Sequence, residues 1–104
     1  MERIRGAVLL ISSTDDGQWP STAMAEQIMA RLRAHGFRCP YTHIANEGAG
    51  HPMGWPYLSV VIPDTPNPAT GRRNENGGPP VATQRARERA WAAMLEFFEA
   101  NLRR

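Results

Sequence analysis

Two short segments in the first half of the chain have the hydrophobic patterns of β-strands. Residues 4–11 (IRGAVLLI) form a continuous apolar run, bounded by charged residues before it and by turn residues after it. This pattern is typical of a parallel strand that is buried on both faces. Residues 40–46 (PYTHIAN) carry a proline only at the start, and the side chains from Tyr41 to Ile44 then alternate between two faces. This alternation predicts a second strand.

The segment between these strands has the spacing of an α-helix. Apolar side chains recur there at every fourth position, at Met24, Ile28 and Leu32. Ser21 is placed to act as the N-cap, and His35 and Gly36 supply the signals of a helix end. We therefore expect a helix over residues 21–35. A strand, a helix and a strand in this order form one right-handed crossover, so the two strands are predicted to run parallel.

The second half of the chain contains a long polar segment followed by one long helical pattern. Residues 63–80 hold almost no apolar side chain and are predicted to form a Pro/Gly-rich loop. Loops of this length in compact domains are usually functional covers or insertions. Residues 81–102 carry an apolar stripe at helical spacing, which predicts a closing helix that packs on another surface. The stripe consists of Trp91, Met94, Leu95, Phe98 and Leu102.

The length and composition fit one small α/β domain over residues 1–104. A chain of 104 residues buries only about two-thirds of the surface that its unfolded form exposes. We find no internal repeat and no domain boundary beyond the loop. Because a domain of this size has only a few kcal/mol of stability to spare, an apolar sheet face left open to water would be costly.

Charge and cysteine content exclude several classes of partner and cofactor. The 12 basic residues are all Arg and are nearly balanced by 10 acids. No aromatic residues alternate with the arginines as base stacking requires, so we expect no nucleic-acid partner. The lone Cys39 permits no internal disulfide, and no Cys or His pair has zinc spacing, so no metal is expected.

The N-terminal apolar run does not indicate a targeting or membrane segment. It is too short for a secretory signal and continues directly into Asp15 without a small-residue cleavage site. No part of the chain approaches the ~20 apolar residues that are needed to cross a bilayer. We therefore predict a cytoplasmic protein without membrane contact.

Candidate chemistry lies just after each predicted strand. Asp15 and Asp16 follow the first strand, and His51 follows the second. Parallel strands bring both positions to the same edge of the sheet, where open α/β sheets hold their sites. Neighbouring strands lie about 4.8 Å apart, so an Asp after one strand can meet a His after the next. A carboxylate that accepts the Nδ1 proton of a His leaves Nε2 free to act as a base. The alternative is that the two carboxylates only cap backbone N–H groups of the turn and that His51 has no role.

An ordered set of motifs resembles the C-terminal part of the acyl-CoA thioester hydrolases and bile acid-CoA:amino acid N-acyltransferases, which are α/β-hydrolase enzymes. The motifs are DDGQWPS, RLRAHGF, NEGAGH, the pair Gly77–Gly78, and RAWAAMLEFFEANL. The resemblance implies that Asp16 is the acid and His51 the base of a catalytic triad. It also implies that the two strands are the last two of the family's sheet. In the family the second acid of the pair falls three residues after a Gly, and here Ser13 stands at that place.

The third member of such a triad has no counterpart in this sequence. α/β-hydrolases carry their nucleophile in a G-x-S-x-G elbow, upstream of the acid and the base. None of the four serines has the flanking glycines, and Cys39 follows a helix end. We therefore expect a C-terminal fragment of a serine-type acyl-CoA thioesterase or acyltransferase, whose nucleophile would lie before Met1. Acyl-CoA or a related ester would be the substrate of the full enzyme, no cofactor is expected, and the isolated 104-residue chain is not expected to be active.

A second hypothesis is a stand-alone, non-catalytic α/β module. Two parallel strands and two helices cannot cover both faces of a strand as apolar as residues 4–11. An open sheet edge invites pairing with another chain. This hypothesis predicts a homo-oligomer formed through the exposed sheet edge, or a module that docks on a partner.

Overall fold

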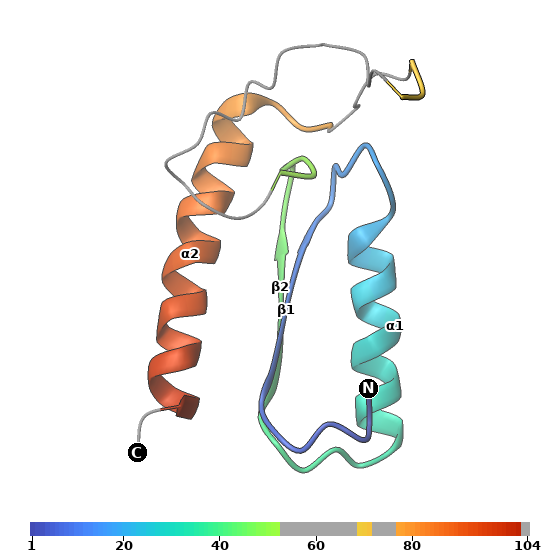
Figure 1. Ribbon diagram of the computed structural model, residues 1–104, viewed down its shortest axis with the longest axis vertical. Helices are drawn as coiled ribbons and strands as arrows, with labels where there is room; N and C mark the ends of the chain where they lie inside the picture. Colours follow the sequence, from blue (N-terminus) through green and yellow to red (C-terminus); the bar gives the residue numbers. More distant parts are fainter. Residues whose placement is uncertain (53–68, 72–76, 103–104) are drawn as a thin grey trace.

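The computed structural model describes residues 1–52, 69–71 and 77–102, and within them the chain has α/β architecture. The elements are β1 (Val8–Ser13), α1 (Ser21–Ala34), β2 (Tyr41–Asn46) and α2 (Pro80–Leu102). β1 and β2 pair in parallel, from Val8↔Tyr41 to Ser13↔Asn46. The two helices lie on opposite sides of this sheet (Figure 1). The predicted class, element order and parallel pairing are therefore confirmed.

The first strand begins and ends later than the apolar run predicts. It starts at Val8 instead of Ile4, because the ladder opens where the Val8 N–H donates to the Pro40 carbonyl (2.9 Å), while the Ile4 N–H donates to Met1 in a turn (3.1 Å). It continues two residues past Ile11 because pairing with β2 runs on to Ser13. A strand's bounds depend on its partner, which the apolar run alone does not reveal.

The expectation that this strand is buried on both faces is wrong among the described residues. Val8 is buried, but the three apolar residues after it are only half-buried. The most buried positions are the polar Ser12 and Ser13, each 3% exposed. They lie at the end of the strand where α2 and both strand-end loops converge (Figure 1). Within β1, burial is thus deepest at the carboxyl end of the strand.

The helix α1 has nearly the predicted bounds but not the predicted cap. It ends at Ala34, and Gly36 follows in the left-handed conformation with φ 61°. Ser21 is the first helical residue, Pro20 holds the N-cap position, and no side chain caps the helix. The Ser21 hydroxyl instead accepts the Ser13 N–H and donates to the Ser13 carbonyl, both at 3.1 Å. Among the described residues β1 pairs with β2 alone, so the Ser21 hydroxyl satisfies the Ser13 backbone groups in place of a further strand.

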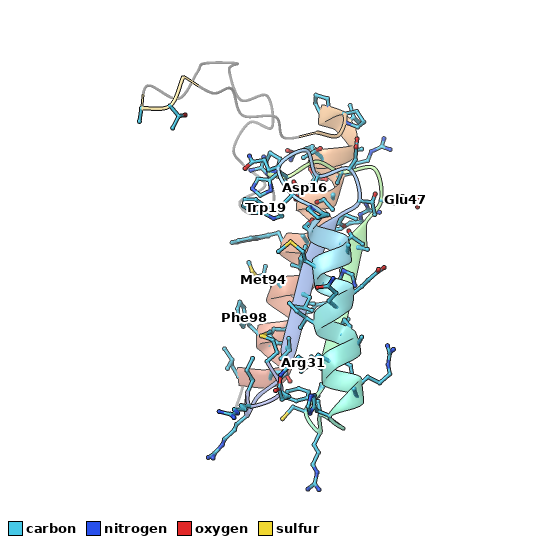
Figure 2. The ribbon with its side chains drawn as sticks, turned by 90° about the vertical axis from the view of Figure 1, so that its right-hand side faces the viewer. Asp16, Trp19, Arg31, Glu47, Met94 and Phe98 are labelled. Carbon is cyan, nitrogen blue, oxygen red and sulfur yellow. The ribbon has the colours of Figure 1, made fainter. Side chains whose placement is uncertain are left out.

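The helix α2 packs by its first half and leaves most of its predicted stripe exposed. Its buried residues are Thr83, Ala86, Arg87 and Ala90. In the second half, Leu95, Phe98 and Leu102 are 52%, 45% and 70% exposed. Met94 and Phe98 follow one another along this half of the helix (Figure 2). The predicted helix is confirmed, but its stripe has little cover within the described residues.

Among the described residues the buried core is small and consists largely of alanines. Its apolar members there are Val8, Ala25, Leu32, Ala49, Ala86 and Ala90, and Leu32 is the largest of these side chains that is fully buried. Small side chains let α1 and α2 approach the sheet closely. The apolar patch at 58–62 and most of the predicted loop at 63–80 lie outside the described residues.

Candidate acid–base site

Two loops meet at the carboxyl edge of the sheet. The acid loop (residues 14–19) follows β1, and the His loop (residues 47–51) follows β2. The Thr14 N–H donates to Asn46 O and the Asp15 N–H to Ala49 O, both at 3.1 Å. The Thr14 hydroxyl also accepts the Gly48 N–H at 2.7 Å. The loops are therefore fixed to one another before any functional side chain is considered.

The predicted pair, Asp16 and His51, is brought together by these loops. His51 Nδ1 lies 3.1 Å from Asp16 Oδ2, across 35 positions of sequence. The Asp16 side chain is 4% exposed and that of His51 is 28% exposed. Because an ionised carboxylate only accepts hydrogen bonds, the proton of this bond belongs to Nδ1. In the neutral ring Nε2 then carries the lone pair and can act as a base.

The Asp16 carboxylate is held by the turn that follows it. Its Oδ1 accepts the N–H groups of Gln18 (2.9 Å) and Trp19 (3.2 Å). Burial alone would raise the pKa of Asp16, and it is the largest single influence. Together the hydrogen bonds from the Gln18 N–H, the His51 ring and the Trp19 N–H outweigh burial, so the pKa of Asp16 lies below its ordinary value of 3.8. The carboxylate is therefore ionised at neutral pH and ready to face a positive charge.

The His51 ring is also positioned by Trp19. The two rings meet edge to face, with centroids 4.5 Å apart and an interplanar angle of 82°. Trp19 itself is 51% exposed. Asp16 and Trp19 lie at the same end of the molecule, whereas Arg31 lies at the other end of α1 (Figure 2). Trp19 thus joins the acid loop to the His loop through its ring contact with His51.

A cavity of about 270 Å³ opens beside this pair. It is lined by Ile11, Ser12, Ser13, Asp16, Trp19, Ser21 and His51. Ser13 Oγ is buried and has no hydrogen-bond partner within the described part of the chain. Ser13 fits this position without special backbone freedom, because no described non-glycine residue has positive φ. The departure from the family's glycine therefore leaves the turn intact.

The remaining candidates have other contacts. Asp15, the neighbour of Asp16, accepts the Gly78 N–H at 3.0 Å. His35 is exposed and follows the last residue of α1, where the sequence predicted the end of the helix. His43 Nε2 lies 2.7 Å from Ser12 Oγ, which is also 2.8 Å from Thr22 Oγ1. Among residues 1–52, 69–71 and 77–102, no three His, Cys, Asp or Glu side chains are grouped as a metal site requires.

Sequence reasoning overlooked the serines that support this site. Ser12, Ser13 and Ser21 lie at the end of β1 and the start of α1, and their hydroxyl or backbone groups join the two elements. The signal that could have found them is the pair Ser12–Ser13, which directly follows the apolar run and so stands where the strand meets the next turn.

The sequence of this chain is similar to known proteins over nearly its whole length. All of residues 1–104 match the sequence profile of the family described as "BAAT / Acyl-CoA thioester hydrolase C terminal". The chain is 33% identical to the mouse acyl-coenzyme A thioesterase 6, over 98% of this chain and 24% of that protein. It is 29% identical to the mouse peroxisomal succinyl-coenzyme A thioesterase, over 98% of this chain and 24% of that protein.

A further relative is the mouse mitochondrial acyl-coenzyme A thioesterase 2, at 31% identity over 98% of this chain and 22% of that protein. The chain thus spans about a quarter of the length of the curated relatives that it matches. No described helix is both long enough and apolar enough to span a membrane. Because the family profile covers every residue, the chain belongs to the BAAT / acyl-CoA thioester hydrolase C-terminal family.

Proposed function

We propose that this chain is the C-terminal portion of an α/β-hydrolase that cleaves acyl-CoA thioesters, with Asp16 and His51 as the acid and the base of its catalytic triad. The observation that carries the proposal is the 3.1 Å contact between His51 Nδ1 and Asp16 Oδ2. These two side chains come from loops that follow two paired parallel strands. The names of the relatives, which are acyl-CoA thioesterases, support the substrate class.

His51 would move a proton in each half of the reaction. A serine or cysteine outside residues 1–104 attacks the thioester carbonyl, and His51 Nε2 takes the proton of that nucleophile. The C–S bond then breaks, and the imidazolium returns the proton to the departing CoA thiolate. In the second half, His51 takes a proton from the water or amine that attacks the acyl-enzyme. The nucleophile is finally released with the proton from the ring.

Asp16 would orient the ring and stabilise its charge. The hydrogen bond from Nδ1 fixes the tautomer in which Nε2 is the base. When the ring becomes an imidazolium, the buried carboxylate lies opposite a full positive charge, and a charge-assisted hydrogen bond of this kind is roughly twice as strong as a neutral one. The low pKa of Asp16 keeps it ionised while His51 changes its protonation state.

Release of free CoA thiol tests this proposal. We expect the full-length gene product that contains residues 1–104 to release thiol from acyl-CoA substrates, with a preference that a series of chain lengths will reveal. Residues 1–104 alone should release none, because the nucleophile and the oxyanion donors lie elsewhere. Turnover by this segment alone would contradict the proposal.

The second candidate is a non-catalytic module that associates through its uncovered apolar surface. The exposure of Leu95, Phe98 and Leu102 on α2 favours it. Covering such a face would stabilise the chain by roughly 25 cal/mol per Å² of apolar area. Light scattering on purified residues 1–104 should then give a mass above that of one chain, and a strictly monomeric folded chain would argue against the module.

The cytoplasmic location stays a prediction, since the names of relatives include a peroxisomal and a mitochondrial protein.

A further inference from the structure

The pair Gly77–Gly78 lies between the acid loop and the His loop, just before α2 begins. A Cβ atom added to Gly77 would overlap the Asp15 carbonyl oxygen and come within 2.7 Å of Gly17 N. A Cβ atom added to Gly78 would overlap Gly50 N and come within 2.7 Å of the Ala49 carbonyl carbon. Each glycine thus lies so close to the backbone of one loop that a side chain does not fit between that glycine and the loop.

Both glycines also have a backbone conformation that other residues rarely adopt. Gly77 has φ 69° and Gly78 has φ 66°. Gly36 and Gly48 share positive φ, at 61° and 72°, but no atom lies within 4 Å of a Cβ added to either of them. Glycine at 77 and 78 is therefore required by close contact as well as by backbone angle, and among the described glycines with positive φ the close contact occurs at these two positions alone.

Polar contacts fix the pair to the same two loops. The Asp15 carboxylate accepts the Gly78 N–H at 3.0 Å. One turn into α2, the Thr83 hydroxyl accepts the Gly50 N–H at 3.0 Å, and Thr83 is 2% exposed. The start of α2 is therefore hydrogen-bonded to the acid loop next to Asp16 and to the His loop next to His51.

We infer that Gly77–Gly78 is a backbone spacer that sets the distance between Asp16 and His51, and that Asp15 is the positioning residue that anchors this spacer. The inference rests on the proposed function of the pair. The two adjacent acids then have different roles. Asp16 accepts the hydrogen bond of the imidazole, and Asp15 binds the Gly77–Gly78 segment, which contacts both loops. Asp15 acts through Asp16 and His51 and touches no substrate.

The spacer also explains how two loops that are joined near their bases hold Asp16 and His51 in a precise arrangement. The loops share backbone bonds near their bases, at Thr14 and Asp15. His51 lies at the far end of the His loop, and its placement also depends on Gly50, which the spacer contacts. A catalytic pair loses rate steeply when its geometry shifts by about 1 Å. Loosening the spacer should therefore lower turnover more than substrate affinity.

The test uses the full-length gene product with Asp15→Ala and Gly78→Ala, and with Gly36→Ala as the matched control. Gly36→Ala also places an alanine at a position with positive φ, but its Cβ meets no atom within 4 Å, and it lies beyond the C-terminal end of α1, away from the site. For acyl-CoA hydrolysis we expect both site variants to lower kcat at least tenfold with KM changed less than threefold. Asp15→Asn keeps an acceptor for the Gly78 N–H and should recover most of kcat, and Gly36→Ala should leave kcat unchanged.

Nitrogen-15 NMR of the His51 ring provides a readout that does not depend on turnover. In the wild type Nδ1 should carry the proton, and in Asp15→Ala and Gly78→Ala the ring should shift toward a mixture of tautomers. An unchanged ring signal in both folded variants would overturn the spacer, whatever their activity. A changed ring signal in an enzyme whose hydrolysis survives His51→Gln would uphold the spacer and refute the proposed function. Asp15 is exposed, so Asp15→Ala gives a result even if Gly78→Ala fails to fold.

Discussion

Replacing Asp16 by Asn should abolish most of the activity while leaving the fold in place. Asn at this position keeps an oxygen for the Gln18 and Trp19 N–H groups that the Asp16 Oδ1 now accepts at 2.9 and 3.2 Å. Its amide nitrogen then faces His51 and donates a hydrogen bond to Nδ1. The proton of the ring moves to Nε2, so that the nitrogen meant to act as a base is blocked.

The expected loss follows from that change of tautomer. In a Ser-His-Asp triad the same substitution lowers kcat about 10⁴-fold, which is about 5 kcal/mol of transition-state stabilisation at about 1.4 kcal/mol per factor of ten. The cost to the free energy of unfolding should be smaller, about 1.5–3 kcal/mol for one hydrogen bond to a charged group. A drop in kcat without loss of the folded protein would therefore separate catalysis from stability.

The assay is CoA thiol release by the full-length gene product, with thermal unfolding measured on the same samples. Glu47→Gln is the control, because it makes the same chemical change on an exposed carboxylate of the His loop. Glu47 lies apart from Asp16 and Trp19 (Figure 2). A kcat for Asp16→Asn within tenfold of wild type, with Nδ1 still protonated, would refute the tautomer argument.

Three further results are expected from the same contacts. The pKa of Asp16 is lower in the folded state, so its contribution to the free energy of unfolding should be complete above pH 3.8 and disappear as the pH falls through the lowered pKa. Denaturant titrations should therefore give free energies of unfolding for wild type and Asp16→Asn that converge at the lowest pH. Leu32→Ala should lower the free energy of unfolding by about 2–5 kcal/mol, because Leu32 is 0% exposed, whereas Met24→Ala on the open face of α1 should cost much less; equal costs would contradict the assigned core. Trp19→Ala removes the edge contact with His51 and should reduce kcat several-fold with a smaller effect on stability, and an unchanged kcat would show that the ring needs no such support.

The elements could be predicted from the sequence because their signals are local. The spacing of Met24, Ile28 and Leu32 specifies α1, and the alternation after Pro40 specifies β2. The bounds of β1 could not be predicted, because its ladder begins where Val8 pairs with Tyr41. A helical stripe indicates an apolar face, but its burial depends on what covers that face, and Phe98 remains 45% exposed.

The pairing of Asp16 with His51 was predictable for a topological reason. Parallel strands deliver the loops after their carboxyl ends to one edge, so the topology predicted that the acids after β1 and His51 after β2 could meet, and the resemblance to a family singled out Asp16. The contacts of Gly77 and Gly78 were not predictable, because they join Gly78 to Asp15 across 63 positions of sequence, and also to the His loop, through a backbone fit that no periodicity encodes. The resemblance to a family included the two glycines as a motif but implied no role for them.

The most direct test of the central claim is the rate of thioester hydrolysis by His51→Gln in the full-length gene product. Glutamine can still accept or donate hydrogen bonds but cannot take a proton from a nucleophile. His35→Gln is the matched control, because His35 is exposed beyond the end of α1. We predict that His51→Gln lowers kcat at least about a thousandfold and that His35→Gln leaves it unchanged. Hydrolysis by His51→Gln at a rate close to wild type would contradict the account.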